Sequence, residues 1–483
     1  MGATFLSKVR IQEFLAEDPA FIRLIYSYFA WATFWLLVGS SAGLLASVKL
    51  LPTTRLSFFG YDLVISGPDF WALPWLSFGR LRMVHTNTVF WGWSTLAMVG
   101  LALYVVPRTS RARLYSFALA RYALWLTNFV VAAGLVTLLA GINNGTQEYR
   151  EYYWPLAFPF AMAVLLNAYN LYMTVARRNV EEIYISNWYI LSSFFWVATL
   201  YTVGYLPWWQ HGLAQTIIQG YYMHNGVGMW FTPFVVGLMY YLLPKFLNRP
   251  IYSYALGVLA FWTQLIFYTL IGTHHYVFSP IPWWLQTTAI VFSIGMMVPV
   301  WAGTGNFLLT CKGKWDTIRR SYSIPFILAG TLFYGLASTQ GSLESLRTAN
   351  LYWHFTNFTI GHSHFAMYGF VAFLIWGGIY GMLPRLTHRE PNIMLVGVHF
   401  WFALLGLLIY GFSLSIGGTE QGRAWVANKP FIESVTVQAP YWLARSFGGT
   451  LMTLSHFLFA YNLWLMRRGA PGEVRPTVAV TAD

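Results

Sequence analysis

The chain has 483 residues, of which 57% are hydrophobic, 19% are aromatic and only 9% are charged. An ordinary soluble domain carries about 25% charged residues, so this composition excludes a soluble globular enzyme, a disordered protein and a coiled coil. The net charge of +13 does not indicate nucleic-acid binding, because the 29 Lys and Arg are scattered between apolar runs. The composition therefore predicts an all-α integral membrane protein with many crossings of the bilayer.

Apolar runs of membrane-crossing length follow one another along the chain. A bilayer core about 30 Å thick needs about 20 apolar residues per helix. We expect a single membrane domain over residues 1–483, with twelve transmembrane helices between about 22 and 467. Their predicted ranges are 22–47, 84–106, 118–141, 155–176, 184–206, 214–243, 252–275, 283–310, 322–341, 352–384, 392–415 and 441–467.

The basic residues indicate the orientation. With twelve spans both termini lie on one side, and the termini plus the even-numbered loops hold 20 of the 29 Lys and Arg. The positive-inside rule then places both short tails in the cytoplasm. Residues 1–20 carry several charges and lack an A-x-A site after a short apolar run, so no cleavable signal peptide is expected. Cys311 is the only cysteine, which excludes an internal disulfide and a C-x-x-C-H haem attachment motif.

Histidines are the polar residues of interest within the spans. Acidic residues are nearly absent there, which disfavours a proton-coupled transporter. Given the predicted orientation, six histidines from four spans lie at a similar depth in the outer part of the membrane: His85, His224, His274, His275, His362 and His364. The remaining histidines are expected to be hydrogen-bonded packing residues: His211, His354, His388, His399 and His456.

Helical geometry separates these six residues into sites. Residues i and i+2 on a helix point about 200° apart, so His362 and His364 face opposite flanks of their span. They can each ligate one large cofactor, and imidazole is a common axial ligand of haem. His364 and His85 could close a six-coordinate haem, and His362 alone would leave a second haem open to a gas. The other three histidines form a set that suits copper, zinc or iron.

At these residues the chain resembles subunit I of the haem–copper oxidase superfamily, and within it the C-family, or cbb3-type, cytochrome c oxidases. The resemblance runs from about the second to the twelfth span. It rests on these strings: L-R-M-V-H-T before the second span, E-I-Y-I-S-N-W at 182–188, M-H-N-G-V-G at 223–228, P-K-F-L-N-R-P-I-Y-S-Y at 244–254, G-T-H-H at 272–275, H-F-T-N-F-T-I-G-H-S-H at 354–364 and A-Y-N near 460.

The resemblance implies roles for these residues. His85 and His364 would be the axial ligands of a low-spin haem b, and His362 the proximal ligand of a high-spin haem b3. Copper B would be bound by His224, His274 and His275. The family's active-site tyrosine corresponds to Tyr268, which the family links covalently to the residue at His224; along a continuous helix it would lie about 9 Å from His274.

Two arginines lie just before the predicted second span. Arg80 and Arg82 could pair with haem propionates, because Arg favours bidentate contacts with carboxylates. They could equally be interfacial residues that snorkel.

The function implied is that of a catalytic subunit of a terminal oxidase in the bacterial cytoplasmic (inner) membrane, which reduces O2 to water. Electrons would come from membrane-anchored c-type cytochrome subunits carrying one and two haems, since this chain lacks their motif. An NO reductase with the same centre is the alternative, although residues 214–243 contain no Asp or Glu for a non-haem iron. A non-catalytic transporter or scaffold is a second alternative, and whether calcium bridges the propionates stays open.

Several positions depart from the family pattern. Gly228 stands four residues after His224, where the A-family carries its tyrosine. Gln340 and Asn357 replace residues that are usually acidic, and Gly257 and Ala260 replace polar ones. The proton path of the family uses tyrosines and hydroxyls in this area, of which Tyr252, Tyr254 and Tyr334 remain. These changes leave open whether protons are pumped.

Overall fold

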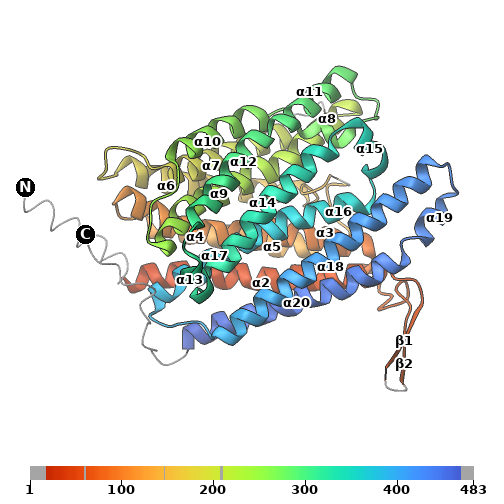
Figure 1. The fold of residues 1–483 in the computed structure, drawn as a ribbon, viewed down its shortest axis with the longest axis horizontal. Helices are drawn as coiled ribbons and strands as arrows, with labels where there is room; N and C mark the ends of the chain where they lie inside the picture. The colour runs from red at the N-terminus through yellow and green to blue at the C-terminus, as the bar shows by residue number, and fades with distance from the viewer. Residues whose placement is uncertain (1–17, 59–60, 146, 207–209, 469–483) are drawn as a thin grey trace, which may run out of the picture.

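The computed structural model describes residues 18–58, 61–145, 147–206 and 210–468, and the predicted cytoplasmic tails lie largely outside them. Long helices run side by side along the longest axis of the molecule (Figure 1). One element departs from the all-α prediction. Strands β1 (Thr54–Phe58) and β2 (Tyr61–Ile65) form an antiparallel hairpin that projects from one end of the bundle (Figure 1).

Helical elements overlap each of the predicted ranges. In chain order they are α2 (Pro19–Lys49), α3 (Phe78–Asn87) with η2 (Thr88–Ser94) and α4 (Thr95–Ser110), α5 (Phe117–Ala140), η3 (Trp154–Leu156) with α6 (Ala157–Ala176), α7 (Ile185–Tyr205), α8 (Leu213–Asn225) with η4 (Gly226–Phe231) and α9 (Thr232–Leu247), α10 (Tyr254–Tyr268) with η5 (Gly272–Tyr276), α11 (Trp283–Gly295) with α12 (Met297–Cys311), α14 (Ile324–Glu344), α16 (Asn357–His364) with η6 (Phe365–Ala372) and α17 (Phe373–Thr387), α18 (Ile393–Val426) and α20 (Ala439–Arg468). The short connecting helices are η1 (Pro74–Leu76), α13 (Trp315–Arg320), α15 (Arg347–Trp353) and α19 (Phe431–Thr436).

Polar side chains define several helix ends. The carboxylate of Asp18 accepts hydrogen bonds from the first backbone amides of α2, and Ser116 and Ser253 cap α5 and α10 in the same way. Gly141 ends α5 in the left-handed conformation, at φ 86°, that glycine adopts without steric cost. Between these caps the helices are held by apolar packing.

The chain is a multi-pass membrane protein. Among the described residues, eight helical segments are long and apolar enough to cross a bilayer, and α10 is a shorter apolar helix. Helices α7, α14 and α20 overlap predicted spans but do not meet these criteria. Two of them carry interior polar residues, such as Gln340 in α14 and Asn462 in α20. Length and composition therefore establish many crossings without establishing the predicted count of twelve.

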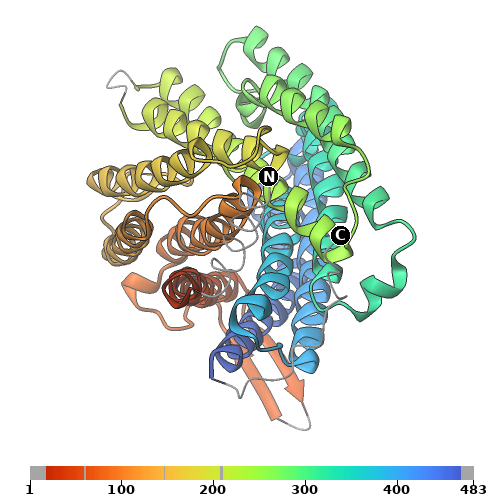
Figure 2. The same ribbon diagram turned by 90° about the vertical axis from the view of Figure 1, so that its left-hand side faces the viewer.

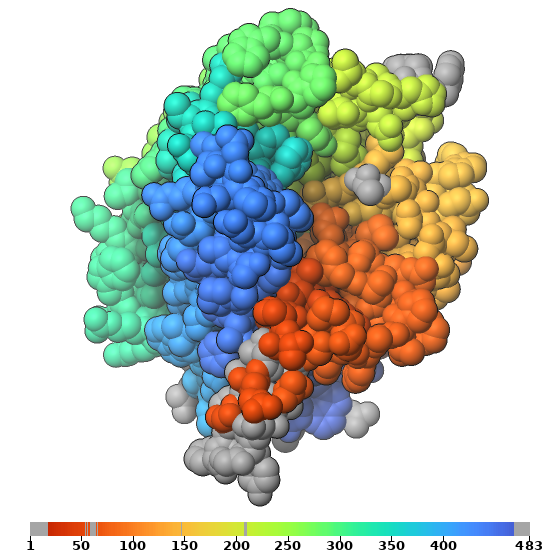
Figure 3. Space-filling model, turned by 90° about the vertical axis from the view of Figure 1, so that its right-hand side faces the viewer, coloured from red at the N-terminus to blue at the C-terminus, as the bar shows by residue number. Residues whose placement is uncertain are grey.

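Three spans form the centre of the bundle. The most apolar 18-residue stretch of each span shows this. It is 94% buried in Phe78–Ser110, 89% in Leu213–Leu247 and 89% in Asn357–Thr387, and half buried or less in the other five spans. Viewed along the helices, the N-terminal and C-terminal halves lie on opposite sides of this centre (Figure 2). Helix α2 packs against α20, so the first and last described helices lie side by side, as Figure 3 shows from the end that carries the hairpin.

Each central span contains a π-helical segment: η2, η4 and η6. Such segments are rare and occur often at functional sites. Here each one begins within three residues of a histidine singled out above, namely His85, His224 or His364. The wider π-helical turn rotates the histidine relative to the apolar residues that follow it on the same span.

Two details of the predicted spans are wrong. Residues 252–275 do not form one helix, because α10 ends at Tyr268 and the paired histidines lie on η5; the distance of about 9 Å expected between Tyr268 and His274 along a helix therefore does not apply. The second membrane segment begins at Phe78, so Arg80 and Arg82 lie on the first turns of α3 and not in a loop.

Candidate functional site

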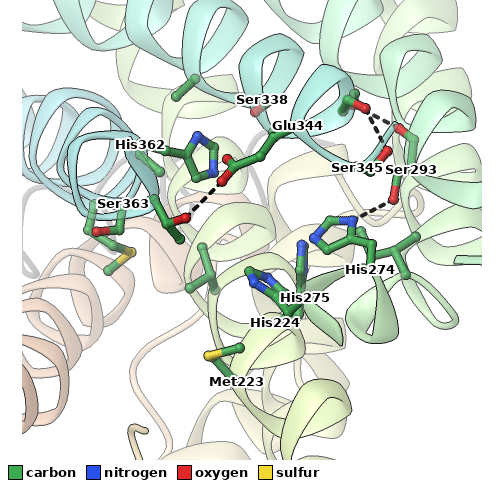
Figure 4. Close-up of a pocket in the computed structure, with 18 of the residues that line it drawn as sticks. Met223, His224, His274, His275, Ser293, Ser338, Glu344, Ser345, His362 and Ser363 are labelled. Atoms are coloured by element: carbon green, nitrogen blue, oxygen red, sulfur yellow. Dashed lines mark hydrogen bonds between the residues drawn. The ribbon is translucent and has the colours of Figure 1, made fainter. Parts of the chain in front are cut away.

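A cavity of about 470 Å³ contains four of the six histidines. Nitrogens of His224, His274 and His275 lie within 4.8 Å of one another. These three rings come from α8 and η5, and their centroids are 4.5 to 5.0 Å apart. His362 lines the same cavity from α16, across from the other three (Figure 4). Four imidazoles thus face one enclosed space.

Hydrogen bonds determine which nitrogen of His274 is free. The Ser293 hydroxyl donates to the carbonyl of Ala289, so its oxygen must accept the hydrogen bond of 2.6 Å with His274 Nδ1. His274 therefore carries its proton on Nδ1 and keeps a lone pair on Nε2, the tautomer that a metal ligand needs.

A different nitrogen is available on His224. Its Nδ1 is buried and has no hydrogen-bond partner among the described residues. An unpaired buried polar atom costs about 1–3 kcal/mol, which a metal ion at this position would relieve. The three-histidine set therefore fits an ion such as copper, because it offers free lone pairs within one small volume.

His362 is oriented by a neighbouring helix. Its Nδ1 lies 3.3 Å from Oε1 of Gln340 on α14, and the amide oxygen can only accept, so Nδ1 carries the proton. Nε2 is then free. A Cβ built on Gly341 would lie 2.8 Å from Cε1 of the His362 ring, so glycine leaves the room that this ring occupies.

A second cavity, of about 230 Å³, lies on the other side of α16 and contains His85 and His364. The two rings are nearly parallel, at 8°, and their centroids are 6.2 Å apart. A metal–imidazole bond is about 2 Å long, so two opposed ligands need about 4 Å between nitrogens in addition to the depth of both rings. A centroid separation of 6.2 Å leaves room for a metal ion between the two rings.

Both of these rings have a fixed tautomer. His85 Nδ1 donates to the carbonyl of Gly39, at 2.8 Å, and His364 Nδ1 donates to the carbonyl of Ile360, also at 2.8 Å. A carbonyl only accepts, so Nε2 of each ring keeps its lone pair. Glycine at position 43 allows α2 to approach, since a Cβ there would overlap the His85 ring. The cavity fits a large planar group with two axial ligands.

Tyr268 lies at the edge of the three-histidine set. Its ring centroid is 4.9 Å from that of His224, and its side chain is 8% exposed. A Cβ built on Gly228 would overlap the Tyr268 ring. Tyr268 can therefore lie beside His224 only because residue 228 is a glycine.

The two arginines of α3 have different environments. Arg80 donates to the carbonyl of Leu139, at 2.7 Å. Arg82 pairs with Glu148 at 2.9 Å and with Glu151 at 3.5 Å, and it lines both cavities together with Glu148. Of the two, only Arg82 faces the space between the histidine sites.

Glu151 lies in the loop between α5 and η3 and is buried. It accepts a hydrogen bond of 2.8 Å from Asn87. Burial raises its pKa to about 7, against the opposing effect of Asn87 and Arg82. In the unfolded chain the carboxyl loses its proton near pH 4.5, whereas the folded protein keeps it to about pH 7. The free energy of unfolding must therefore fall as the pH rises across this window and level off above it.

We expect Glu151→Gln to remove this pH dependence, which amounts to about 3 kcal/mol between pH 4.5 and 7.5. Thermal unfolding of the purified complex across that range measures it. Glu433→Gln, at a carboxylate that is 55% exposed, is the matched control and should keep the wild-type slope. An unchanged slope in Glu151→Gln would contradict the assignment.

The hydrogen bond to Ser293 gives a prediction for the metal site. Ser293→Ala removes the group that holds the His274 tautomer, and loss of such a partner costs about 10–100-fold in metal affinity. The measurement is copper content after dialysis against a graded chelator. Ser413→Ala, on the half-buried Ser413 of α18, which hydrogen-bonds only the carbonyl of Ile409, should leave copper retention unchanged. Equal retention in both variants would argue against a ligand role for His274.

The sequence analysis did not single out two residues that line the larger cavity. Glu344, the last residue of α14, lines the larger cavity and accepts a hydrogen bond of 2.9 Å from Thr359. Figure 4 shows its side chain directed towards His362. His354 was assigned to packing, but its Nε2 donates to the carbonyl of His275 at 2.6 Å and it lines the same cavity. A signal existed for Glu344, because Gln340 and Glu344 are one helical turn apart and share a face.

The residues that depart from the family pattern have defined surroundings. The Asn357 side-chain amide donates to Gln438 at 2.9 Å and to Gln421 at 3.1 Å, where a carboxylate would have no proton to donate. Gly257 and Ala260 of α10 are buried within the bundle. Of the tyrosines, Tyr334 is buried and lines the larger cavity, whereas Tyr252 and Tyr254 are exposed on the bundle surface.

Comparisons with known proteins agree with this geometry. The model of the family described as cytochrome c and quinol oxidase polypeptide I matches residues 23–451. The cbb3-type cytochrome c oxidase subunit CcoN1 of Stutzerimonas stutzeri is 30% identical over 468 residues, which cover 93% of this chain and 96% of that protein. Cytochrome c oxidase subunit 1 of Rhodobacter capsulatus is 30% identical over 490 residues, covering 97% and 90%. A solved haem–copper terminal oxidase dimer shares the fold, with a TM-score of 0.75 at 16% identity over 94% of this chain and 85% of that one.

Proposed function

Because this chain belongs to the cytochrome c and quinol oxidase polypeptide I family, we propose that its two histidine-lined cavities hold two haems and one copper ion at which O2 is reduced to water. The chain is the catalytic subunit of a haem–copper oxidase and spans the bacterial inner membrane many times. The family and its named relatives do not favour an NO reductase.

One observation carries the proposal about the cofactors: His362 and His364, two residues apart on α16, open into different cavities, and each cavity supplies further imidazoles. We assign low-spin haem b to His85 and His364, and high-spin haem b3 to His362. Copper B belongs to the set formed by His224, His274 and His275. When bound, these groups supply the redox chemistry and the open coordination position for O2.

The chain's own residues orient these ligands. Carbonyl groups, Gln340 and Ser293 each hold one histidine in the tautomer that leaves its other nitrogen free. Much of the surrounding core is apolar, which strengthens electrostatic interactions within the cavities. The phenol of Tyr268, beside His224, is the group that we assign to supply a proton and an electron to the reacting oxygen.

The position of Arg82 supports a role towards the haem carboxylates. It lines both cavities, so its guanidinium can contact propionates from either side. We assign this role to Arg82. Arg80 is the weaker candidate for a propionate contact, because its guanidinium already donates to the carbonyl of Leu139. The Glu148 carboxylate is already paired with Arg82 at 2.9 Å, so it does not by itself supply the six to eight oxygen ligands of a calcium site.

The proposed topology has twelve transmembrane helices with both tails in the cytoplasm. Support comes from the first and last described helices, because α2 begins and α20 ends at the same end of the bundle (Figure 1). The histidine cavities lie towards the opposite end, which would face outward. Electrons would enter there from c-type cytochrome subunits with one and two haems, and the protons for the reduction would come from the cytoplasm.

The test is the cofactor content and gas consumption of the purified complex. We expect two haems b and one copper per chain, and O2 consumption with a reduced c-type cytochrome as donor. Two haems and an additional iron, with NO turnover but no O2 turnover, would favour the reductase. Absence of b-type haem bands in the reduced-minus-oxidised spectrum would overturn both assignments.

A further inference from the structure

Two buried histidines outside the cofactor sites each have one ring nitrogen without a partner. His399 of α18 and His456 of α20 are 0% and 2% exposed. The Nε2 of His399 and the Nδ1 of His456 have no hydrogen-bond partner among the described residues, and the same holds for Nε1 of the fully buried Trp376. Each such atom costs about 1–3 kcal/mol if it stays unpaired, so packing alone does not explain this cluster.

The three unpaired nitrogens belong to rings that touch. The Trp376 ring contacts both histidines, with centroid distances of 4.8 Å to His399 and 5.6 Å to His456. A buried water typically makes about three hydrogen bonds to groups of this kind. One indole donor and two imidazole nitrogens supply that number.

Hydrogen bonds extend from this cluster in both directions. On one side the Tyr380 hydroxyl lies 3.1 Å from His399 Nδ1. Asn462 lies beside Tyr380 and accepts from the amide of Asn392, the exposed cap of α18. Arg389 donates to the carbonyl of Arg467, the next-to-last residue of α20. The Asn392 end of the line is therefore at the end of the bundle where α20 ends.

On the other side the line reaches the smaller cavity. His456 Nε2 lies 3.1 Å from the Tyr368 hydroxyl, which lies 3.4 Å from Ser455 Oγ. Tyr368 and His456 both line the cavity that contains His85 and His364. The other charged or titratable groups that face it are Arg82, Glu148, Tyr149, Tyr410 and Arg445.

We propose that a buried water joins His399, His456 and Trp376, and that the resulting line from Tyr380 to Tyr368 conducts protons between the inner end of the bundle and the His85–His364 cavity. An imidazole can accept a proton on one nitrogen and release one from the other. For each electron that reaches this cavity, one proton enters at Tyr380, passes through His399 and the water, and ends on His456 in the cavity wall, so the net charge of the cavity is unchanged. The inference rests on the proposed function, since it requires a haem between His85 and His364.

The test measures proton uptake when the low-spin haem is reduced by a light-triggered donor in the complete complex, with a pH-indicating dye. We expect Tyr380→Phe and His456→Gln each to slow uptake by at least about tenfold. Tyr380→Phe removes one oxygen and keeps the ring, so it preserves packing. His211→Gln, at an exposed histidine outside the line, is the control and should match the wild type.

Haem content and CO binding are measured on the same samples. If both haems are present and both variants take up protons at the wild-type rate, the proton line is overturned and the proposed function stands. If the wild-type complex contains no haem, both are overturned. A high-resolution map of the complex should also show water density between the three unpaired nitrogens, and a dry cluster there would contradict the proposal.

Discussion

Replacing His362 with alanine is expected to abolish CO binding by the complex while the spectrum of the low-spin haem remains. His362 is the only imidazole that α16 directs into the larger cavity, and its Nε2 is free because Nδ1 is bound to Gln340. Without it, the high-spin haem that we assign to this cavity would have no protein ligand. O2 consumption should fall by at least about 1000-fold, as happens when an essential catalytic group is removed. The measurements are reduced-minus-oxidised and CO difference spectra.

Replacing His364 with alanine is expected to have the opposite spectral effect. His364 opens into the smaller cavity opposite His85, so its loss should remove the six-coordinate haem signal and create a second haem that binds CO. Ser363→Ala, between the two histidines, is the matched control, because its hydroxyl donates only to the carbonyl of Ile360. Retained CO binding in His362→Ala, or identical spectra for the two histidine variants, would contradict the assignment of the cavities.

Replacing Tyr268 with phenylalanine is expected to lower O2 consumption by about 100- to 10,000-fold while haem and copper content stay normal. The ring keeps its packing against His224, but the hydroxyl proton is lost, and proton transfer from a positioned group contributes this much to a rate. Activity within a factor of three of the wild type would exclude Tyr268 from the reaction.

Gly228→Ala tests the position of the same ring without changing the phenol. A methyl group at position 228 would overlap the Tyr268 ring and displace it from His224, so a loss of similar size is expected. Gly305→Ala is the control, because a Cβ on Gly305 of α12 meets nothing within 4 Å. Normal activity in Gly228→Ala would show that the reaction does not need the ring where the structure places it.

The sequence predicted the membrane fold and the candidate ligands because both depend on local patterns. Apolar runs of bilayer length indicate helices whatever their neighbours are. The spacing of His362 and His364 depends on helical geometry alone, and the structure directs them into separate cavities as that geometry requires. The break after Tyr268 was missed, because the apolar run continues through residues 269–271 and carries no proline or charge to mark it.

Other features could not be predicted because they join residues from distant parts of the chain. Ser293 holds His274 from another helix, and Gly39 holds His85 across 46 positions. Glu344 and Thr359 meet only because α14 and α16 pack together. The sequence predicted His399 and His456 to be packing residues. Nothing in the residues around either histidine shows that its ring would contact Trp376 or that one of its nitrogens would lack a partner.

The sequence by itself determined that this protein lies in the membrane, and it predicted which imidazoles are candidate metal ligands, because hydropathy and helical period are properties of neighbouring residues. The tertiary structure alone decided which nitrogen of each ring is free, where the Tyr268 phenol lies and which buried polar atoms lack partners. Those properties depend on hydrogen bonds and contacts between helices, and an interhelical contact exists only once the bundle has packed.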